Sequence, residues 1–368
     1  MKKIVFGITC LNLGGAERVL VDIVNELCYK YEITIFTLYG KGELIDEINK
    51  KAKIVSLYDG AVDEISFLKK KWLSIQLVNN SLRNKLYEKY IKGKYDIEIA
   101  FLEGPISWLF SCNSDARKIC WIHSDIEKIF GDNTRSKMKQ KLNEKIYDVY
   151  DSIVFVSKDN KDKFISRFSN NDVTKEVIYN YLNKDMVRKK AQEEIGEIDD
   201  DSISFVQVSR LVEAKAIDRL IKVHKKLIDD GYKHKIYVVG DGPLKIELDK
   251  LIEKNDVKDS FVLLGSRKNP YPYIKKGDYF ILTSKYEGFG MVVQEAEMLD
   301  KYILITDMAA REAVENYDNS VIVENSEEGL YDGLKDIIIN KPVVSKSYIF
   351  DNKNILENII KVIEGDKK

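Results

Sequence analysis

A glycine-rich turn with an acidic residue on either side is the first feature of the sequence that could do chemistry. It lies between Ser284 and Ala296 and follows an apolar run, Tyr279–Thr283, that predicts a strand. Gly288 and Gly290 would let the backbone approach a ligand closely, and a helix beginning there would point its first N–H groups at an anion. This pattern predicts a phosphate-binding turn.

The two acidic residues of this segment are unsuited to binding phosphate directly, because like charges repel. Glu287 comes just before the expected helix, and Glu295 is expected about two turns into it. Carboxylates accept hydrogen bonds from hydroxyl groups, so we expect one of them to bind a sugar and the other a ribose. A glycine-rich turn with solvated acids is the alternative for this segment taken alone.

Two cations follow another expected strand in the same half of the chain. The run Ser202–Val208 leads into Ser209–Lys215, which places Arg210 and Lys215 five residues apart. A guanidinium fork and an ammonium point charge suit a diphosphate. A tight turn, Val239–Pro243, follows a later strand and is expected at the same edge of the sheet.

Gly14 and Gly15 follow the first expected strand and open a helix in the other half of the chain. Their spacing is not the G-x-G-x-x-G of dinucleotide-binding proteins, which disfavours an NAD-dependent dehydrogenase.

The composition is that of an ordinary globular chain of two domains. The chain has 368 residues, 44% hydrophobic and 32% charged, with a net charge of -1, so no global field draws it to nucleic acid. No apolar run approaches the roughly 18 residues of a membrane-spanning helix. The four cysteines show no C-x-x-C pair, which favours reduced core thiols and a cytoplasmic location.

Short apolar runs alternate with helical patterns along the whole chain, which predicts βαβ units in doubly wound parallel sheets. Strands are expected at residues 3–9, 32–38, 53–57, 96–102, 118–123, 152–157 and 176–179, and then at 202–209, 235–239, 260–264, 279–283, 302–306 and 320–323. A closing helix is expected over residues 352–363.

The pattern restarts after an acidic stretch that ends at residue 201, which predicts two Rossmann-like α/β domains facing a central cleft. We place the domains at residues 1–185 and 186–345, and expect a C-terminal segment, 346–368, to pack back across their junction. The acidic trio 199–201 precedes a strand rather than following one, so we interpret it as a solvated linker and not as a metal-binding pair.

The chain resembles the retaining glycosyltransferases of family four, which have the two-lobed architecture called GT-B. The resemblance rests on six motifs in family order: GGAER at Gly14–Arg18, WIHSD at Trp121–Asp125, VSK at Val156–Lys158, SRLVEAK at Ser209–Lys215, VGDGP at Val239–Pro243, and EGFG with a second glutamate at Glu287–Glu295.

The resemblance implies a role for each matching residue. Arg210 and Lys215 should grip the donor diphosphate, helped by backbone N–H groups of the turn into the helix. Glu295 should bind the ribose and Glu287 the transferred sugar, while His123 should lie near the reacting centre. The remaining expected contacts are Gly14 and Gly15 on the phosphate or sugar, Gly265 near the base, and Gly288, Phe289, Gly290, Met291 and Val292 around the phosphates.

The family's reaction needs no metal or other cofactor, since the two cations stabilise the leaving diphosphate. The resemblance also implies retention of anomeric configuration, with the departing diphosphate oxygen helping to deprotonate the acceptor, so no covalent nucleophile is assigned. The sequence departs from the family at Ala216, where glycine is usual, and at Glu297, where the usual run after the second glutamate is Ala-Met.

The half of the chain that is expected to bind the acceptor contains a basic and aromatic segment, residues 68–94, with eight basic residues and one acidic residue. Such a segment suits an anionic membrane surface where lipid-linked acceptors lie. A solvated basic helix that packs its apolar face on the core is an equally weighted alternative, and it leaves the protein cytoplasmic without contact at the inner face of the membrane.

The sequence as a whole favours a retaining, metal-independent glycosyltransferase. It would move a sugar from a UDP-sugar, with a GDP-sugar as the alternative, to a lipid-linked or glycan acceptor in surface polysaccharide biosynthesis. A sugar-nucleotide epimerase of the same fold and a non-catalytic two-lobed ligand-binding protein are the competing hypotheses.

Overall fold

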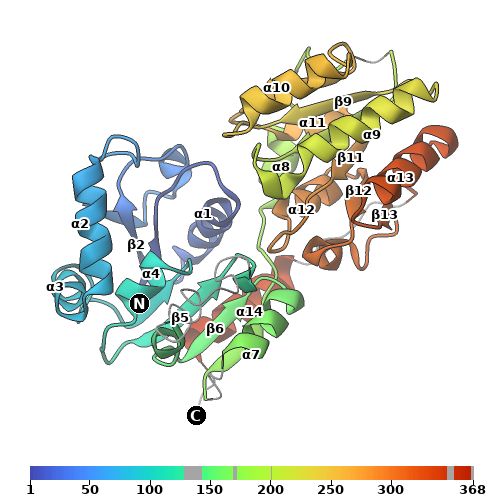
Figure 1. The fold of residues 1–368 in the computed structure, drawn as a ribbon. Coiled ribbons are helices and arrows are strands. Elements are labelled where there is room, and N and C mark those ends of the chain that lie inside the picture. The colour runs from blue at the N-terminus through green and yellow to red at the C-terminus, as the bar shows by residue number, and fades with distance from the viewer. Residues whose placement is uncertain (128–142, 169–171, 200, 346–351, 366–368) are drawn as a thin grey trace. The chain divides into compact units, whose positions relative to one another are not determined.

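The computed structural model describes residues 1–127, 143–168, 172–199, 201–345 and 352–365. The chain divides into two compact units (Figure 1). The first unit is Met1–Leu182 with Asp351–Lys368, and the second is Asn183–Phe350.

The first unit is built on a seven-stranded parallel sheet in the order β3-β2-β1-β4-β5-β6-β7. Its central strands are buried on both faces, as is typical of parallel strands covered by helices. The strands are β1 (Lys3–Ile8), β2 (Glu32–Tyr39), β3 (Lys53–Tyr58), β4 (Ile97–Ala100), β5 (Arg117–Ile122), β6 (Ser152–Phe155) and β7 (Thr174–Val177).

The described helices of this unit include one that returns from the far end of the chain. They are α1 (Gly15–Leu27), α2 (Phe67–Val78), α3 (Asn80–Tyr90), α4 (Pro105–Phe110), α7 (Lys158–Arg167) and α14 (Asn352–Glu364). Helix α14 is fixed by a hydrogen bond from Arg117 Nε to the Val362 carbonyl, 3.1 Å, and by one from Tyr31 Oη to Glu364, 2.7 Å.

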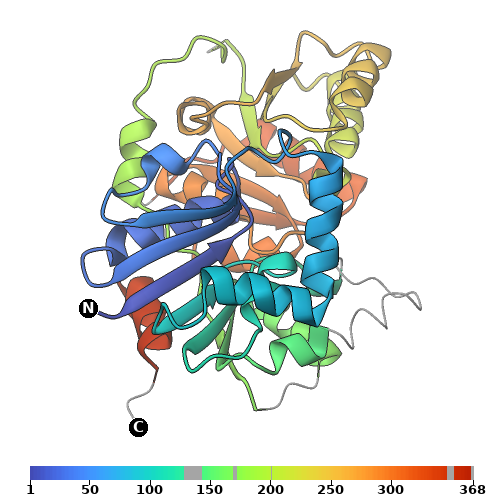
Figure 2. The same cartoon turned by 90° about the vertical axis from the view of Figure 1, so that its left-hand side faces the viewer.

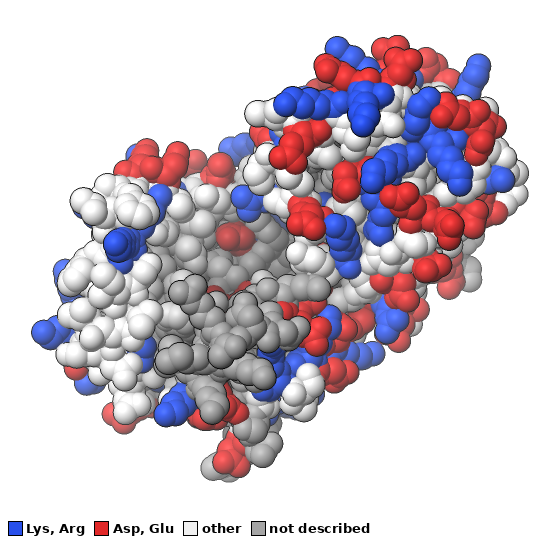
Figure 3. Space-filling view, in the orientation of Figure 1, with Lys and Arg blue, Asp and Glu red and all other residues white. Residues whose placement is uncertain are grey.

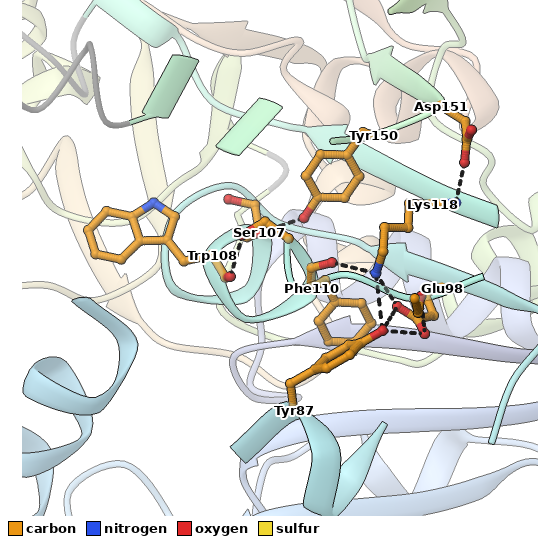
Figure 4. A network of polar contacts seen from close by, with 10 residues as sticks. Tyr87, Glu98, Ser107, Trp108, Phe110, Lys118, Tyr150 and Asp151 are labelled. Carbon is orange, nitrogen blue, oxygen red and sulfur yellow. Dashed lines mark hydrogen bonds and ion pairs between the residues drawn. The ribbon is translucent and has the colours of Figure 1, made fainter. Parts of the chain in front are cut away.

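Helices α2 and α3 form a pair that packs on α4 at the side of the first unit's sheet (Figure 2). A buried polar network joins α3 to the strands (Figure 4): Tyr87 Oη donates to the Glu98 carboxylate at 2.8 Å, and Lys118 Nζ pairs with Glu98 at 2.5 Å. Burial lowers the pKa of Lys118 and raises the pKa of Tyr87. Because a buried charge that loses its partner is costly, this network fixes the position of the helix pair.

The second unit contains a six-stranded parallel sheet in the order β10-β9-β8-β11-β12-β13. The strands are β8 (Ser204–Val208), β9 (Lys235–Val239), β10 (Phe261–Gly265), β11 (Tyr279–Leu282), β12 (Tyr302–Thr306) and β13 (Ser320–Val323). The helices are α8 (Lys184–Lys190), α9 (Ile217–Asp229), α10 (Lys245–Lys254), α11 (Tyr271–Lys276), α12 (Met291–Met298) and α13 (Glu327–Asn340), with 3-10 turns at Glu213–Lys215 and Ala309–Val314.

The prediction of two doubly wound parallel α/β sheets is confirmed, and every expected strand is present with ends that shift by a few residues. The strand β6 ends at Phe155 rather than at Ser157 for a local reason. Ser157 caps helix α7, because its hydroxyl accepts a hydrogen bond from the Asn160 backbone N–H at 3.1 Å. Of the acidic trio, Asp199 and Asp201 pair with Lys235, and residue 200 lies outside the described residues.

Candidate functional site

The strand order of the second unit places two loops side by side at a topological switch point. Strands β8 and β11 are neighbours, whereas the strands that follow them, β9 and β12, lie on opposite sides. Ligands of doubly wound sheets bind at such a point, beyond the carboxyl ends of the strands. The loop after β8 contains Arg210 and Lys215, and the loop after β11 contains Glu287 and Gly288.

The loop after β11 turns into a helix at Gly290. This glycine adopts a left-handed conformation with φ of 79°, and a Cβ built on it would lie 2.8 Å from the Cβ of Ala310. Glycine alone avoids both costs. Helix α12 therefore begins at Met291, with Val292 in its first turn, and Glu295 lies just over one turn into it. We expected Glu295 about two turns into the helix, which was wrong because the helix begins later in the sequence than we expected.

An ion pair joins the two loops. Lys215 Nζ contacts Glu287 Oε1, and the same oxygen accepts a hydrogen bond from Ser284 Oγ at 2.7 Å. The side chains of Lys215 and Glu287 are 19% and 13% exposed. One cation and one carboxylate thus reach a common position from strands β8 and β11.

The backbones of these two loops are also bonded to each other. The Lys285 N–H donates to the Ala214 carbonyl at 2.7 Å, and Thr283 Oγ1 donates to the Lys215 carbonyl at 3.0 Å. The next residue, Ala216, is left-handed with φ of 50°. That conformation favours glycine, which gives a physical reason for the glycine that the resembling family usually has here.

The loop that contains Arg210 is packed tightly by the turn after β9. A Cβ on Gly240 would lie 1.9 Å from the Ser209 carbonyl oxygen, and one on Gly242 would lie 2.4 Å from that of Leu211. The Arg210 side chain is exposed and makes no ion pair or hydrogen bond with the described residues. Its guanidinium is therefore available to a ligand.

Glu295 is largely buried, 9% exposed, and accepts a hydrogen bond from Tyr271 Oη at 3.3 Å. Phe289 is buried at the turn that precedes α12. Gly265 ends strand β10 with φ of 76°, and its carbonyl accepts a hydrogen bond from the Gly240 N–H at 2.9 Å. The residues that we predicted to bind the nucleotide-sugar in the second unit thus lie at or beyond the carboxyl ends of β8, β10 and β11.

The first unit has its own switch point, between β1 and β4. Gly14 and Gly15 are exposed, and Gly14 is the N-cap of helix α1. Arg18 of the same motif is held by Glu47, 2.6 Å away, which makes it a structural contact within the unit.

His123 follows β5 at the same edge of the first sheet. Its backbone N–H donates to Glu103 at 3.0 Å, and its ring lies 4.8 Å from that of Phe101. Its Nε2 is buried and has no hydrogen-bond partner in the described parts of the chain. Burial lowers the pKa of His123 to about 3, so the imidazole is neutral at pH 7.

Our sequence reasoning missed four residues that support these sites. Glu103, which follows β4, could have been found as a carboxylate at a strand end. Arg219, Thr306 and Asn325 gave no sequence signal, because their hydrogen bonds to the loop after β11 come from distant segments. In the described ranges, no group of three or more His, Cys, Asp or Glu side chains could hold a metal ion.

Comparison with known proteins identifies the class to which this fold and site belong. Residues 188–353 match the family described as Glycosyl transferases group 1. The second unit therefore contains a group 1 glycosyl transferase domain, and the resemblance stated from the motifs is confirmed, as is the prediction of a glycosyltransferase.

Two bacterial glycosyltransferases are among the individual proteins similar to this chain. A Campylobacter jejuni enzyme, N-acetylgalactosamine-N,N'-diacetylbacillosaminyl-diphospho-undecaprenol 4-alpha-N-acetylgalactosaminyltransferase, is 26% identical, covering 99% of this chain and 100% of its own. The amylovoran biosynthesis glycosyltransferase AmsD of Erwinia amylovora is 26% identical, covering 78% of this chain and 75% of its own.

A solved structure confirms the two-unit fold. The crystal structure of Anabaena HepE in complex with UDP and glucose has a TM-score of 0.78 at 17% identity, covering 99% of this chain and 100% of that one.

Proposed function

We propose that this protein is a retaining, metal-independent glycosyltransferase that moves a sugar from a nucleotide-diphosphate sugar, in the first place a UDP-sugar, to a lipid-linked or glycan acceptor. The observation that carries the proposal is the meeting of Lys215 and Glu287 at the switch point of the second sheet, beside the start of α12. A diphosphate needs cations and helix-start N–H groups, and a sugar needs a carboxylate for its hydroxyls.

The donor would lie across the two loops of the second unit. Exposed Arg210 and half-buried Lys215 would bind the diphosphate, with backbone N–H groups of residues 289–292. Positioned donors of this kind stabilise the charge that grows on the diphosphate as the glycosidic bond breaks, which is the work a metal ion does in other enzymes. Glu295 would bind the ribose, and Glu287 the transferred sugar.

The first unit would contribute Gly14, Gly15 and His123. The His123 imidazole is neutral, and among the described residues its buried Nε2 has no hydrogen-bond partner, so it can exchange one hydrogen bond with a sugar hydroxyl without bringing a charge. No covalent nucleophile is assigned, and the departing diphosphate oxygen would take the proton of the acceptor hydroxyl.

The acceptor class is proposed from the relatives and from helix α2. The Campylobacter jejuni relative is named for a diphospho-undecaprenol acceptor, and AmsD for amylovoran biosynthesis. Helix α2 buries Leu73 and Leu77 but exposes a second apolar stripe: Leu68 is 75% exposed, Trp72 50% and Ile75 46%.

The surface over α2 is mainly uncharged with scattered basic side chains (Figure 3). Exposed Lys69 and Lys71 flank the apolar stripe. Apolar and basic side chains together suit the surface of an anionic bilayer, so we propose peripheral contact with the inner face of the cell membrane. Among the described residues, no helix is long and apolar enough to cross a membrane.

Thermal-shift screening against a panel of UDP- and GDP-sugars tests the donor site, because a ligand at 100 times its Kd stabilises the folded state by about 2.7 kcal/mol. The donor that shifts Tm is then assayed for transfer to an undecaprenyl-diphosphate-linked glycan, with and without EDTA. Transfer that resists EDTA supports the proposal, and loss of activity restored by manganese contradicts its metal-free part.

Two other outcomes point to the competing functions. Conversion of the nucleotide-sugar into an isomer without any acceptor would indicate an epimerase. Binding of the donor with no transfer to any of a broad set of acceptors would indicate a non-catalytic binding protein. Retention is checked by the anomeric configuration of the product in NMR.

A further inference from the structure

Three successive backbone carbonyls in the loop after β11 are held by side chains from three other segments. Arg219 Nη2, on helix α9, donates to the Thr283 carbonyl at 2.8 Å. Thr306 Oγ1, at the end of β12, donates to the Ser284 carbonyl at 2.8 Å. Asn325 Nδ2, in the loop after β13, donates to the Lys285 carbonyl at 3.1 Å.

These carbonyls lie two to four residues before Glu287. A loop carbonyl ordinarily bonds to water, and a loop held only by water can shift. Here the backbone position is fixed on both sides, because the Lys285 N–H also donates to the Ala214 carbonyl at 2.7 Å. The bonds therefore set the place from which the Glu287 carboxylate reaches Lys215.

Arg219 and Asn325 act on the loop as a pair. Arg219 donates to the Asn325 carbonyl at 3.0 Å and to its side-chain oxygen at 2.7 Å. This leaves Asn325 Nδ2 directed at the loop, where it also lies 3.3 Å from the Ser284 carbonyl; it lies 3.3 Å from the carbonyl of Asp307, which follows β12, as well. Arg219 thus holds the loop once directly and once through Asn325.

A guanidinium group is an unusual hydrogen-bond donor to loop carbonyls at a half-buried position such as that of Arg219. It is half-buried, burial lowers its pKa, and in the described ranges it has no salt bridge with a carboxylate. A cation removed from water without a carboxylate is costly, whereas its planar fork can serve several carbonyls at once. Arg219 also lies four residues after Lys215, so the start of α9 fixes both loops.

We propose that Arg219 and Asn325 are positioning residues that hold the loop bearing Glu287 in register with Lys215, a role that rests on the proposed function. Both would act through the backbone of that loop, by the hydrogen bonds to the Thr283 and Lys285 carbonyls. Their effect would be larger on sugar transfer, which needs Glu287, than on nucleotide binding, because the hydrogen bonds of the pair go to the backbone before Glu287 and, in the described parts of the chain, none goes to Glu295 or Gly265.

The decisive variant is Asn325→Asp. It keeps the oxygen that accepts from Arg219 but replaces the donating NH2 with an acceptor, which repels the loop carbonyls. We expect faster amide exchange at residues 284–290. We also expect kcat to fall about tenfold or more, because a small misplacement of reacting groups is costly. The Kd for UDP should change far less. Lys222→Ala, an exposed residue on the same helix α9, is the control and should change none of these.

A second variant, Arg219→Ala, adds a rescue experiment. Guanidinium at millimolar concentration should restore part of its transfer activity, and should restore none in Glu287→Gln, which lacks the group being positioned. Unchanged amide exchange at residues 284–290 in Asn325→Asp, or full kcat in that variant, overturns the inference. If the unaltered chain transfers no sugar while the exchange effect is present, the proposed function fails and the positioning of the loop stands.

Discussion

Replacing Glu297 with methionine should make the second unit considerably more stable. Glu297 is on helix α12, is fully buried, and neither carboxylate oxygen has a hydrogen-bond partner in the described parts of the chain. Burial raises its pKa to about 9, so the carboxyl group is protonated and neutral in the folded protein at pH 7. Methionine has a similar length and no polar atom to desolvate, and it is the residue that the resembling family usually has here.

The size of the effect follows from proton linkage. The carboxyl group ionises near pH 4.5 in the unfolded chain but only near pH 9 in the folded one. Between these values the folded state binds the extra proton, so the contribution of Glu297 to stability falls by about 1.4 kcal/mol for each unit that the pH rises. At pH 7 this amounts to about 3 kcal/mol, which Glu297→Met should recover.

Urea denaturation at pH 5.5 and pH 8.0 measures this difference. All three tryptophans, Trp72, Trp108 and Trp121, belong to the first unit, so their fluorescence follows that unit, while far-UV circular dichroism follows both. The stability gain of Glu297→Met should be about 1.4 kcal/mol at pH 5.5 and nearly 5 kcal/mol at pH 8.0. Glu253→Gln, an exposed change on α10, is the control.

The Glu297→Gln variant separates the two contributions to the effect. It removes the ionisation but leaves an unpartnered polar group, so it should lie between the native chain and Glu297→Met. Unfolding free energies that run parallel with pH in the native chain and in Glu297→Met would refute the reasoning, since a carboxyl that is ionised in the folded state gives no such divergence.

Three further predictions concern the donor site, acid stability and the membrane. Glu295→Gln should weaken binding of free UDP in calorimetric titration, whereas Glu287→Gln should bind UDP almost normally yet transfer sugar poorly; equal loss of UDP affinity in both would show that the sugar role of Glu287 is wrong. His224 and His234 hydrogen-bond to each other at 2.8 Å, and burial lowers their pKa values to about 3 and about 4. Since the two imidazoles bind protons below about pH 6.5 in the unfolded chain and not in the folded one, the Glu297→Met variant, which lacks the opposite pH dependence of Glu297, should lose about 3 kcal/mol of stability from pH 7.5 to pH 5.5; a flat acid limb in circular dichroism melts of that variant would contradict this. Reversing the charges of Lys69–Lys71 should reduce cosedimentation with anionic vesicles and leave donor binding intact; unchanged cosedimentation would exclude membrane contact through α2.

The sequence determined the sheets and the order of the motifs because both are written in local patterns. Runs such as Ile4–Phe6 are apolar at every position, which is typical of a strand buried on both faces. The turn before α12 was predicted for the same reason. Its backbone is left-handed at Gly290, and glycine is the residue type that favours this conformation. Its exact helix start was missed, because one turn more or less changes no local pattern.

Only the tertiary structure decided which side chains meet. Lys215 and Glu287 are 72 residues apart, and their contact depends on β8 and β11 being neighbours, a strand order that no local pattern encodes. Asn325 looks like any loop asparagine in the sequence, yet it holds the backbone before Glu287 because β13 ends beside that loop. Burial of Glu297 likewise depends on the packing around α12. Residue types and their spacing specify local conformation. Long-range packing decides which partner a polar side chain meets and how far that side chain is removed from water, and these two factors set its free energy.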